Sequence, residues 1–96
     1  MSFDRRITPF RSDLADERLR GQVEAERFTA GAARRIVSSF VSLHRHPSRE
    51  APVDTQAIFG EGVTVYDEND GWAWVQLHAD GYVGYVPSVA LGHPGA

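Results

Sequence analysis

The chain has 96 residues, enough for one domain, and its 42% hydrophobic and 24% charged residues are typical of a globular protein. The net charge of −3 gives no general attraction to nucleic acid or to an anionic membrane surface, so neither partner is expected. The absence of cysteine excludes disulfides, thiolate metal sites and a cysteine nucleophile from this chain.

Residues 1–22 are polar, charged and poorly periodic, which predicts a partly irregular N-terminal arm. Ser12 or Asp13 can cap a short helix that ends before Gly21. Only three apolar residues would form the buried face of this helix: Leu14, Ala15 and Leu19. Because so small a face cannot hold a helix by itself, we expect the arm to be mobile or to pack on a neighbouring molecule.

No apolar run follows the basic pair Arg5-Arg6, and no apolar stretch approaches the length that crosses a membrane. The sequence therefore predicts no secretory signal, no membrane partner and a cytoplasmic address.

Strand-like alternation begins after the arm. It covers residues 23–28, breaks at a turn in residues 29–31, and resumes in residues 33–43, which are rich in β-branched and aromatic side chains. In residues 33–43 the alternation assigns side chains to two faces, with Val37, Val41 and Leu43 on one and Ile36 and Phe40 on the other. Residues 44–54 are expected to be a loop, because two prolines there exclude a central strand.

The second half of the chain is more regular, with strands expected at residues 55–59, 63–66, 72–77 and 82–86. Polar turns at residues 67–71 and 78–81 contain the glycines that hairpin turns prefer. A 3₁₀ turn is expected at residues 88–91. The strand at residues 72–77 would place Ala73, Val75 and Leu77 on one face and Trp72, Trp74 and Gln76 on the other.

Short strands at close spacing, joined by glycine and aspartate turns, indicate a small all-β barrel rather than an α/β fold. We expect five to six strands in residues 23–96, preceded by the extended arm of residues 1–22. The side chains expected to fill the barrel are Val37, Val41, Ala57, Val63, Val65, Ala73, Val75, Val86 and Leu91.

Two segments near the C-terminus resemble the last strands of an SH3 domain. They read Gly71-Trp72-Ala73-Trp74-Val75 and Gly84-Tyr85-Val86-Pro87-Ser88, with Leu91 after them, in the order and spacing of that fold. Eukaryotic SH3 domains carry an aromatic run on the first strand, which residues 39–47 lack. Residues 39–47 and 56–65 together look like the first strands of a bacterial SH3 domain, so the expected fold is an SH3-like barrel.

A narrower resemblance comes from Asp80-Gly81-Tyr82-Val83-Gly84-Tyr85, which is similar to the Gly-Tyr-x-Gly-Trp motif of NlpC-type cell-wall-peptide peptidases, with Tyr85 where tryptophan is usual. Residues 18–28 also look like the leader of one bacterial branch of that family. The motif belongs to the domain that precedes the catalytic half of these cysteine peptidases, which cut between γ-D-glutamate and a diamino acid. The resemblance therefore implies an NlpC-type catalytic domain as partner, in the same gene or on a separate chain.

The resemblance also implies a ligand site at Glu61 and Tyr82, because a glutamate and a tyrosine of this barrel face the active-site cleft in the family. A carboxylate and a hydroxyl bind an ammonium group through strong charge-assisted hydrogen bonds, so the pair would clamp the free N-terminal L-Ala of a murein peptide. The alternative is that Glu61 lies in a solvated turn and Tyr82 packs on the barrel wall.

Trp74 and Tyr85 are further candidates for ligand contacts, with Trp72 a weaker one. Their strands give the side chains an outward component, and exposed aromatic clusters mark binding surfaces. The alternative is packing at the edge of the barrel under the N-terminal arm.

No metal, cofactor or catalytic residue is expected in this chain. His44 and His46 would lie on one side of an extended segment, but two histidines without a third ligand do not form a zinc site. The acidic residues 67–70 lack the alternating ligands of a calcium loop and are interpreted as a hairpin turn. No serine lies in a nucleophile motif.

Three functions follow from these patterns. The first is a non-catalytic recognition domain of a cell-wall-peptide peptidase. The second is a stand-alone SH3-like module that binds a proline-rich peptide or protein partner, although the missing first-strand aromatic run argues against it. The third is a purely structural domain that shields a partner and binds no ligand.

Overall fold

The computed structural model describes residues 4–93, which form nine strands and two 3₁₀ turns and contain no α-helix. The elements are β1 (Leu14–Asp16), η1 (Glu17–Leu19), β2 (Arg27–Thr29), β3 (Ala32–Ile36), β4 (Phe40–His44), β5 (Val53–Ile58), β6 (Gly62–Asn69), β7 (Trp72–Leu77), β8 (Val83–Pro87), η2 (Ser88–Ala90) and β9 (Leu91–Gly92). The predicted all-β fold is confirmed, and η2 lies within the segment where a 3₁₀ turn was expected.

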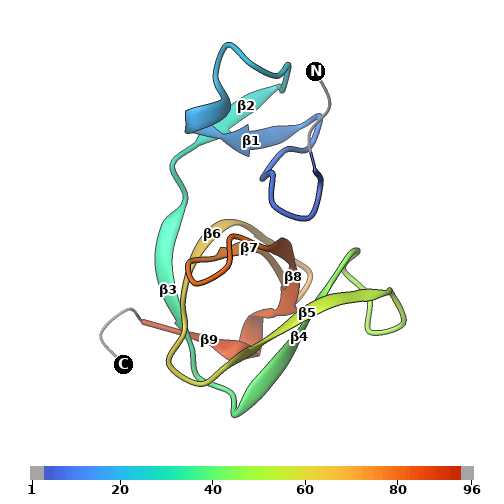
Figure 1. The fold of residues 1–96 in the computed structure, drawn as a ribbon, viewed down its shortest axis with the longest axis vertical. Coiled ribbons are helices and arrows are strands. Elements are labelled where there is room, and N and C mark those ends of the chain that lie inside the picture. The colour runs from blue at the N-terminus through green and yellow to red at the C-terminus, as the bar shows by residue number, and fades with distance from the viewer. Residues whose placement is uncertain (1–3, 94–96) are drawn as a thin grey trace.

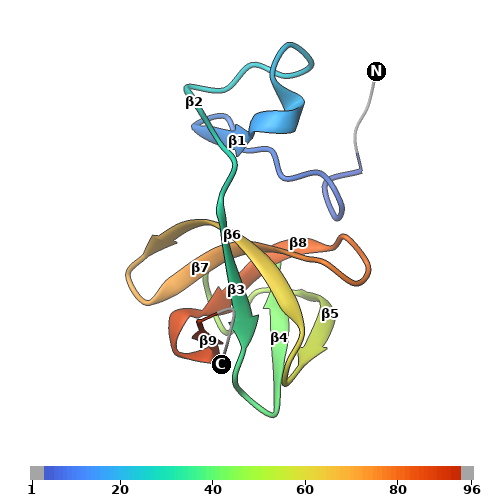
Figure 2. The ribbon, with the colours of Figure 1, turned by 90° about the vertical axis from the view of Figure 1, so that its left-hand side faces the viewer.

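Seven of these strands form one antiparallel sheet in the order β5-β4-β8-β7-β6-β3-β9. The sheet curls around its core, as Figure 1 shows. Strands β1 and β2 pair in parallel as a separate small sheet, which lies above the curled sheet in Figure 2. The number of strands exceeds five to six because residues 33–43 divide into β3 and β4 and because residues 91–92 add β9.

The main core lies inside the curled sheet and consists of Ile36, Val41, Leu43, Ala57, Val63, Val65, Ala73, Val75, Leu77, Val86, Ala90 and Leu91. All the residues expected in the core are buried except Val37, which is 37% exposed. The predicted faces of β7 are confirmed, since Ala73, Val75 and Leu77 point into this core.

The expected faces of residues 33–43 are wrong at Ile36 and Val37. Ile36 is fully buried, whereas Val37 and Phe40 are exposed. The reason is that β3 ends at Ile36 and β4 begins at Phe40, so a turn restarts the alternation. Val37 instead donates its backbone N–H to the carbonyl of Ala90 in η2.

Strand β6 is longer than the expected residues 63–66, because the acidic segment continues the strand as far as Asn69. The hairpin turn is confined to Asp70 and Gly71, whose φ values of 52° and 80° are both positive. Two central residues with positive φ form the tight turn that matches the twist of paired strands, and Asp-Gly is a preferred sequence for it.

Where a single helix was expected, the N-terminal arm forms strand β1 and the 3₁₀ turn η1, and it packs on the curled sheet. Leu14, Ala15 and Asp16 are all buried in β1, and the Asp16 carboxylate caps η1 by accepting from the Arg18 N–H. Leu14 joins a second buried cluster, here called the arm cluster, which consists of Leu14, Tyr66, Trp74 and Val83. The expectation of a mobile arm, or one packed on another molecule, is therefore wrong. The division of the chain at residue 22 stays a prediction.

Candidate ligand-binding site

Glu61 lies in the turn between β5 and β6 and is only half-buried. Its Oε2 accepts a hydrogen bond from the backbone N–H of Ile58 at 2.7 Å, and its own N–H donates to the Ile58 carbonyl at 3.2 Å. The clamp hypothesis expects no strong partner for Glu61 within this chain, and that expectation is wrong. The turn fixes one oxygen of the carboxylate, while no hydrogen bond within residues 4–93 uses the other oxygen, Oε1.

Tyr82 directly precedes β8 and packs, half-buried, against the main core. Its N–H donates to the Asp80 carboxylate at 3.0 Å, and its carbonyl accepts from the Leu77 N–H at 2.8 Å. Within the described residues, no hydrogen bond involves its hydroxyl. The backbone of Tyr82 is thus held in the β7–β8 hairpin, and its phenol is anchored by apolar contact.

Glu61 and Tyr82 lie at the same end of the curled sheet. The Gly62 carbonyl accepts from the His78 N–H, and the Leu77 N–H donates to Tyr82, so the two residues flank the end of β7. Two strand spacings of about 4.8 Å put their backbones roughly 10 Å apart. Tyr82 packs on the main core, to which Val63 of β6 also belongs, whereas Glu61 lies in the turn before β6.

Trp74 is not an exposed aromatic side chain. It is only 4% exposed and lies in the arm cluster, with its ring 5.2 Å from the Tyr66 ring. The Arg11 guanidinium of the arm covers the indole at 4.7 Å from the ring centroid. Trp74 therefore packs under the arm, as the alternative expects, and a ligand contact from Trp74 stays a prediction.

Tyr85 and Trp72 keep part of their surface in water. The Tyr85 hydroxyl accepts from Arg11 at 3.4 Å, and its ring packs against the arm cluster. Trp72 meets the His44 ring edge-on at 5.6 Å between centroids. With Pro47, these two aromatic residues line an open hollow of about 230 Å³, so a ligand contact from Tyr85 stays a prediction.

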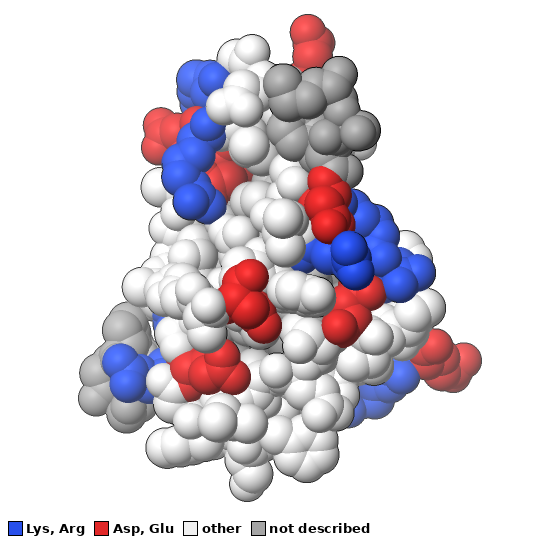
Figure 3. Space-filling model, in the orientation of Figure 1, with Lys and Arg blue, Asp and Glu red and all other residues white. Residues whose placement is uncertain are grey.

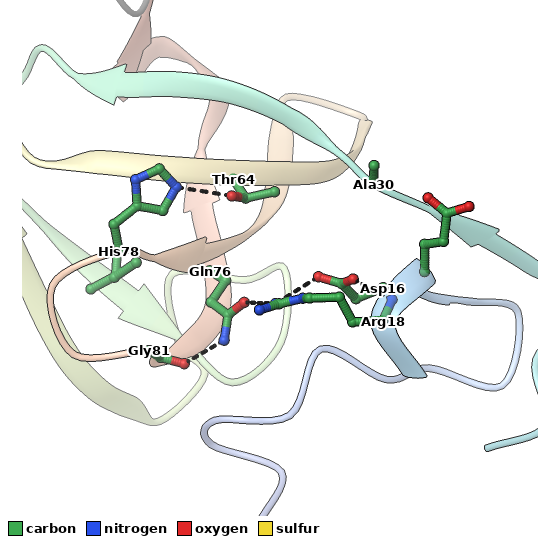
Figure 4. A pocket seen from close by; sticks show the side chains of 9 residues that line it. Asp16, Arg18, Ala30, Thr64, Gln76, His78 and Gly81 are labelled. Atoms are coloured by element: carbon green, nitrogen blue, oxygen red, sulfur yellow. Dashed lines mark hydrogen bonds and ion pairs between the residues drawn. The ribbon is translucent and has the colours of Figure 1, made fainter. Parts of the chain in front are cut away.

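A polar cleft of about 620 Å³ separates the arm from β6 and β7 (Figure 4). In it, the Asp16 carboxylate accepts from Arg18 Nη2 at 2.7 Å and from the Tyr66 hydroxyl. Gln76 Oε1 accepts from the same Arg18 nitrogen at 2.9 Å and lies 3.0 Å from the Tyr66 hydroxyl oxygen. We call these four residues, Asp16, Arg18, Tyr66 and Gln76, the arm latch, because they join the arm to the sheet.

The arm latch keeps Asp16 ionised although its side chain is only 5% exposed. Burial opposes ionisation, but the hydrogen bonds from Arg18 and Tyr66 outweigh it and hold the pKa of Asp16 below its usual value. Two further contacts are drawn in Figure 4: Gln76 Nε2 donates to the Gly81 carbonyl at 2.9 Å, and His78 Nε2 lies 2.9 Å from Thr64 Oγ1. The bonds from Arg18 to Gln76 and from Tyr66 to Asp16 join the arm to the sheet across the cleft.

A cluster of exposed apolar side chains lies at the turns between β3 and β4 and between β5 and β6. Phe40 and Ile58 are opposite one another across β4 and β5, and Phe59 follows directly. These three side chains, here called the apolar end, are 62%, 61% and 63% exposed. The corresponding lower end of the molecule has no blue or red side chains in Figure 3. Sequence reasoning missed this surface because apolar strand residues are normally assigned to a core.

His44 and His46 do not share one side of an extended segment. His44 is buried at the end of β4, where a bulge shifts the register, and its Nδ1 lies 3.1 Å from the Ala51 carbonyl. His46 is exposed in the following loop. No group of three or more histidine or acidic side chains within residues 4–93 is arranged to hold a metal ion.

Residues 43–91 match a family described as the bacterial dipeptidyl-peptidase SH3 domain. The match runs from the last two residues of β4 to the first residue of β9 and includes the turns that contain Glu61 and Tyr82. No curated protein and no solved structure matches the chain. Neither 3₁₀ turn in the described part of the chain has the length and apolarity of a membrane-crossing helix.

Proposed function

The chain belongs to the bacterial dipeptidyl-peptidase SH3 domain family, and from this membership we propose that it is the recognition domain of an NlpC-type cell-wall-peptide peptidase. The coarse role, a non-catalytic accessory domain of a peptidase, follows from the family. In our proposal the chain docks on a cysteine-peptidase domain and binds the free N-terminal L-Ala of a murein peptide. This selects turnover products over intact cell wall, and a cytoplasmic address belongs to the same proposal.

The observation that supports the proposal is that Glu61 and Tyr82 flank the end of β7. The bond from the Ile58 N–H to Glu61 Oε2 orients the carboxylate and leaves Oε1 for an ammonium group. A preoriented carboxylate loses less conformational entropy when the ligand binds. The internal partner of Glu61 is thus compatible with a binding role.

The apolar end supports the docking part of the proposal. Taking about 200 Å² for a fully exposed aromatic side chain, Phe40 and Phe59 alone leave roughly 250 Å² of apolar surface in water. Exposed apolar patches of several hundred Å² mark interaction surfaces. Phe59 is two residues from Glu61 in the same turn, so a domain docked there would lie beside the proposed clamp.

The test is the kinetics of the peptidase domain in the presence of this chain, with L-Ala-γ-D-Glu-diaminopimelate as substrate. Glu61→Gln keeps the shape but removes the charge, and kcat/KM should fall by roughly one to two orders of magnitude, as the loss of a charge-assisted bond predicts. Glu50→Gln, in the exposed loop after β4, is the matched control and should have no effect. The chain alone should release no L-Ala-D-Glu.

The N-acetylated substrate separates recognition of the amine from a general loss of function. Acetylation removes the ammonium charge, so this substrate should be poor for the unaltered protein, and Glu61→Gln should hardly worsen it. An equal loss of kcat/KM on both substrates would show that Glu61 does not bind the amine.

The hollow beside Trp72 favours one alternative, the binding of a proline-rich peptide. Trp72, Tyr85 and Pro47 line it, and aromatic grooves of this kind bind extended proline-rich segments. Binding of such a peptide that is lost in Trp72→Ala and retained in Glu61→Gln would favour this function over amine recognition.

A further inference from the structure

A third pocket, of about 470 Å³, forms where the arm, the loop after β4 and strand β8 meet. Arg5 and Arg11 from the arm, Arg45 and His46 from the loop, and Tyr85 from β8 line it. Basic side chains gather on the right flank in Figure 3, at the level where the arm meets this loop. None of these residues belongs to the proposed amine clamp, so the pocket requires its own explanation.

A buried carboxylate fixes two of the arginines. Asp54 has a side chain only 5% exposed, and it accepts from Arg5 Nη1 at 3.1 Å and from Arg45 Nη2 at 3.0 Å. Hydrogen bonds from Arg5 lower the pKa of Asp54, and those from Arg45 lower it further, although burial acts in the opposite direction. The carboxylate is therefore ionised at neutral pH. One negative charge thus lies against two positive charges, and one positive charge is left to face the pocket.

The remaining wall adds hydrogen-bonding capacity rather than charge. Arg11 is neutralised by Asp13 and by Asp67 at 3.1 Å. It donates to the Tyr85 oxygen at 3.4 Å, which leaves the Tyr85 hydroxyl proton available to an acceptor in the pocket. Phe10, 40% exposed, supplies an apolar surface at the rim.

We propose that this pocket binds a carboxylate group of a peptide, with Arg5 and Arg45 as the charge partners and Tyr85 as a hydrogen-bond donor. Both Nη atoms of Arg5 contact Asp54, whereas Arg45 uses only Nη2, so the rest of the planar Arg45 guanidinium can donate to the carboxylate of a ligand. The single uncompensated charge suits one carboxylate, and the net charge of −3 disfavours polyanions such as nucleic acid. The inference goes beyond the proposed function, since the pocket would bind a peptide whose amine is blocked.

The test is an NMR titration of the full chain with N-acetyl-glutamate, which carries carboxylates and no amine. Saturable shifts are expected at Arg5, Arg45 and Tyr85, whereas uncharged N-acetylglutaminamide should leave them in place. Arg45→Gln should weaken binding by about tenfold, as the loss of a charge-assisted bond predicts. Arg49→Gln, in the same loop but outside the pocket, should not change the affinity.

Arg45→Lys is a second variant, needed if Arg45→Gln disturbs the loop. It keeps a positive charge beside Asp54 and removes only the planar guanidinium group with its paired N–H donors. It should bind N-acetyl-glutamate with an affinity between those of the unaltered chain and Arg45→Gln. Glu61→Gln should bind normally, so a failure of the amine clamp would not imply a failure here. Equal affinity in all arginine variants, or tighter binding of inorganic phosphate at the same residues, would overturn the carboxylate site.

Discussion

The main core and the arm cluster bury apolar side chains on opposite faces of the same strands, but they are built differently. The main core is aliphatic and follows the two-residue alternation of the strands, as Ala73, Val75 and Leu77 show. The arm cluster combines Leu14 with two aromatic rings and is bordered by the ionised groups of the arm latch. The alternation of apolar side chains within one strand is therefore enough to identify the main core. The arm cluster forms only when the arm folds back on the sheet.

Trp74→Ala gives the largest expected effect and tests whether the arm cluster is as essential as the main core. Removing a buried tryptophan side chain costs about 3–5 kcal/mol of unfolding free energy. Urea denaturation measures it, with Val89→Ala at an 84% exposed position as the control that should cost almost nothing. A loss below that of Val75→Ala would mean that the ring faces outward in solution and the arm is not packed on it.

Val75→Ala tests the main core by itself. Val75 is fully buried, and deletion of its methyl groups should destabilise the sheet by about 1–3 kcal/mol. Val65→Ala, across the β6–β7 pair, should fall in the same range. Hydrogen exchange at β7 and in β1 should rise together in both variants, because the arm packs on the sheet. Unchanged protection of β1 would show that the arm is stabilised by other contacts.

Gly31→Ala tests the connection between the two regions. Gly31 has φ +76°, and a Cβ there would lie 2.5 Å from Thr64 Cγ2 and 2.9 Å from the Val65 carbonyl oxygen. The expected cost is about 2 kcal/mol or more, since a left-handed alanine costs about 1–2 kcal/mol before any clash. Gly60→Ala is the control, because Gly60 has φ +92° and an added Cβ would meet nothing within 4 Å. It carries the cost of the left-handed backbone without a steric clash, so it should destabilise the protein less. Equal costs would remove the argument for close packing at this connection.

The pH dependence of stability tests the arm latch and has the smallest expected effect, about 1 kcal/mol. The folded-state pKa of Asp16 is lowered, so its contribution is complete above its unfolded value of about 3.9 and is lost as the pH falls through the folded pKa. Unfolding free energies measured from pH 7 to pH 2 should show this loss. Asp16→Asn should flatten the curve below pH 4, and an unchanged slope would contradict the role given to Asp16.

Much of the curled sheet could be predicted from the sequence because its signals are local. Strand β7 was expected with its observed bounds, since Trp72 to Leu77 alternate and glycine turns flank them. The turn at Asp70-Gly71 is likewise specified by two adjacent residues. The break after Ile36 was missed because neither proline nor glycine marks it.

The arm and the surroundings of the candidate site depend on contacts that no local pattern records. Tyr66 reaches Asp16 across 50 positions of sequence, so the burial of β1 could not be predicted from residues 1–22 alone. Glu61 could be identified as a candidate, but its bond to the Ile58 N–H depends on a side-chain rotamer set by the turn. The pocket between Arg5 and Arg45 requires both the folded arm and the loop.

The most direct test of the central claim, recognition of a free peptide amine by Glu61 and Tyr82, is an NMR titration of this chain with L-Ala-γ-D-Glu-diaminopimelate and with its N-acetylated form. The account predicts saturable shifts at Glu61, His78 and Tyr82 with the free-amine peptide only, and their loss in Glu61→Gln. Equal shifts with both peptides, or shifts at these residues that persist in Glu61→Gln, would contradict it.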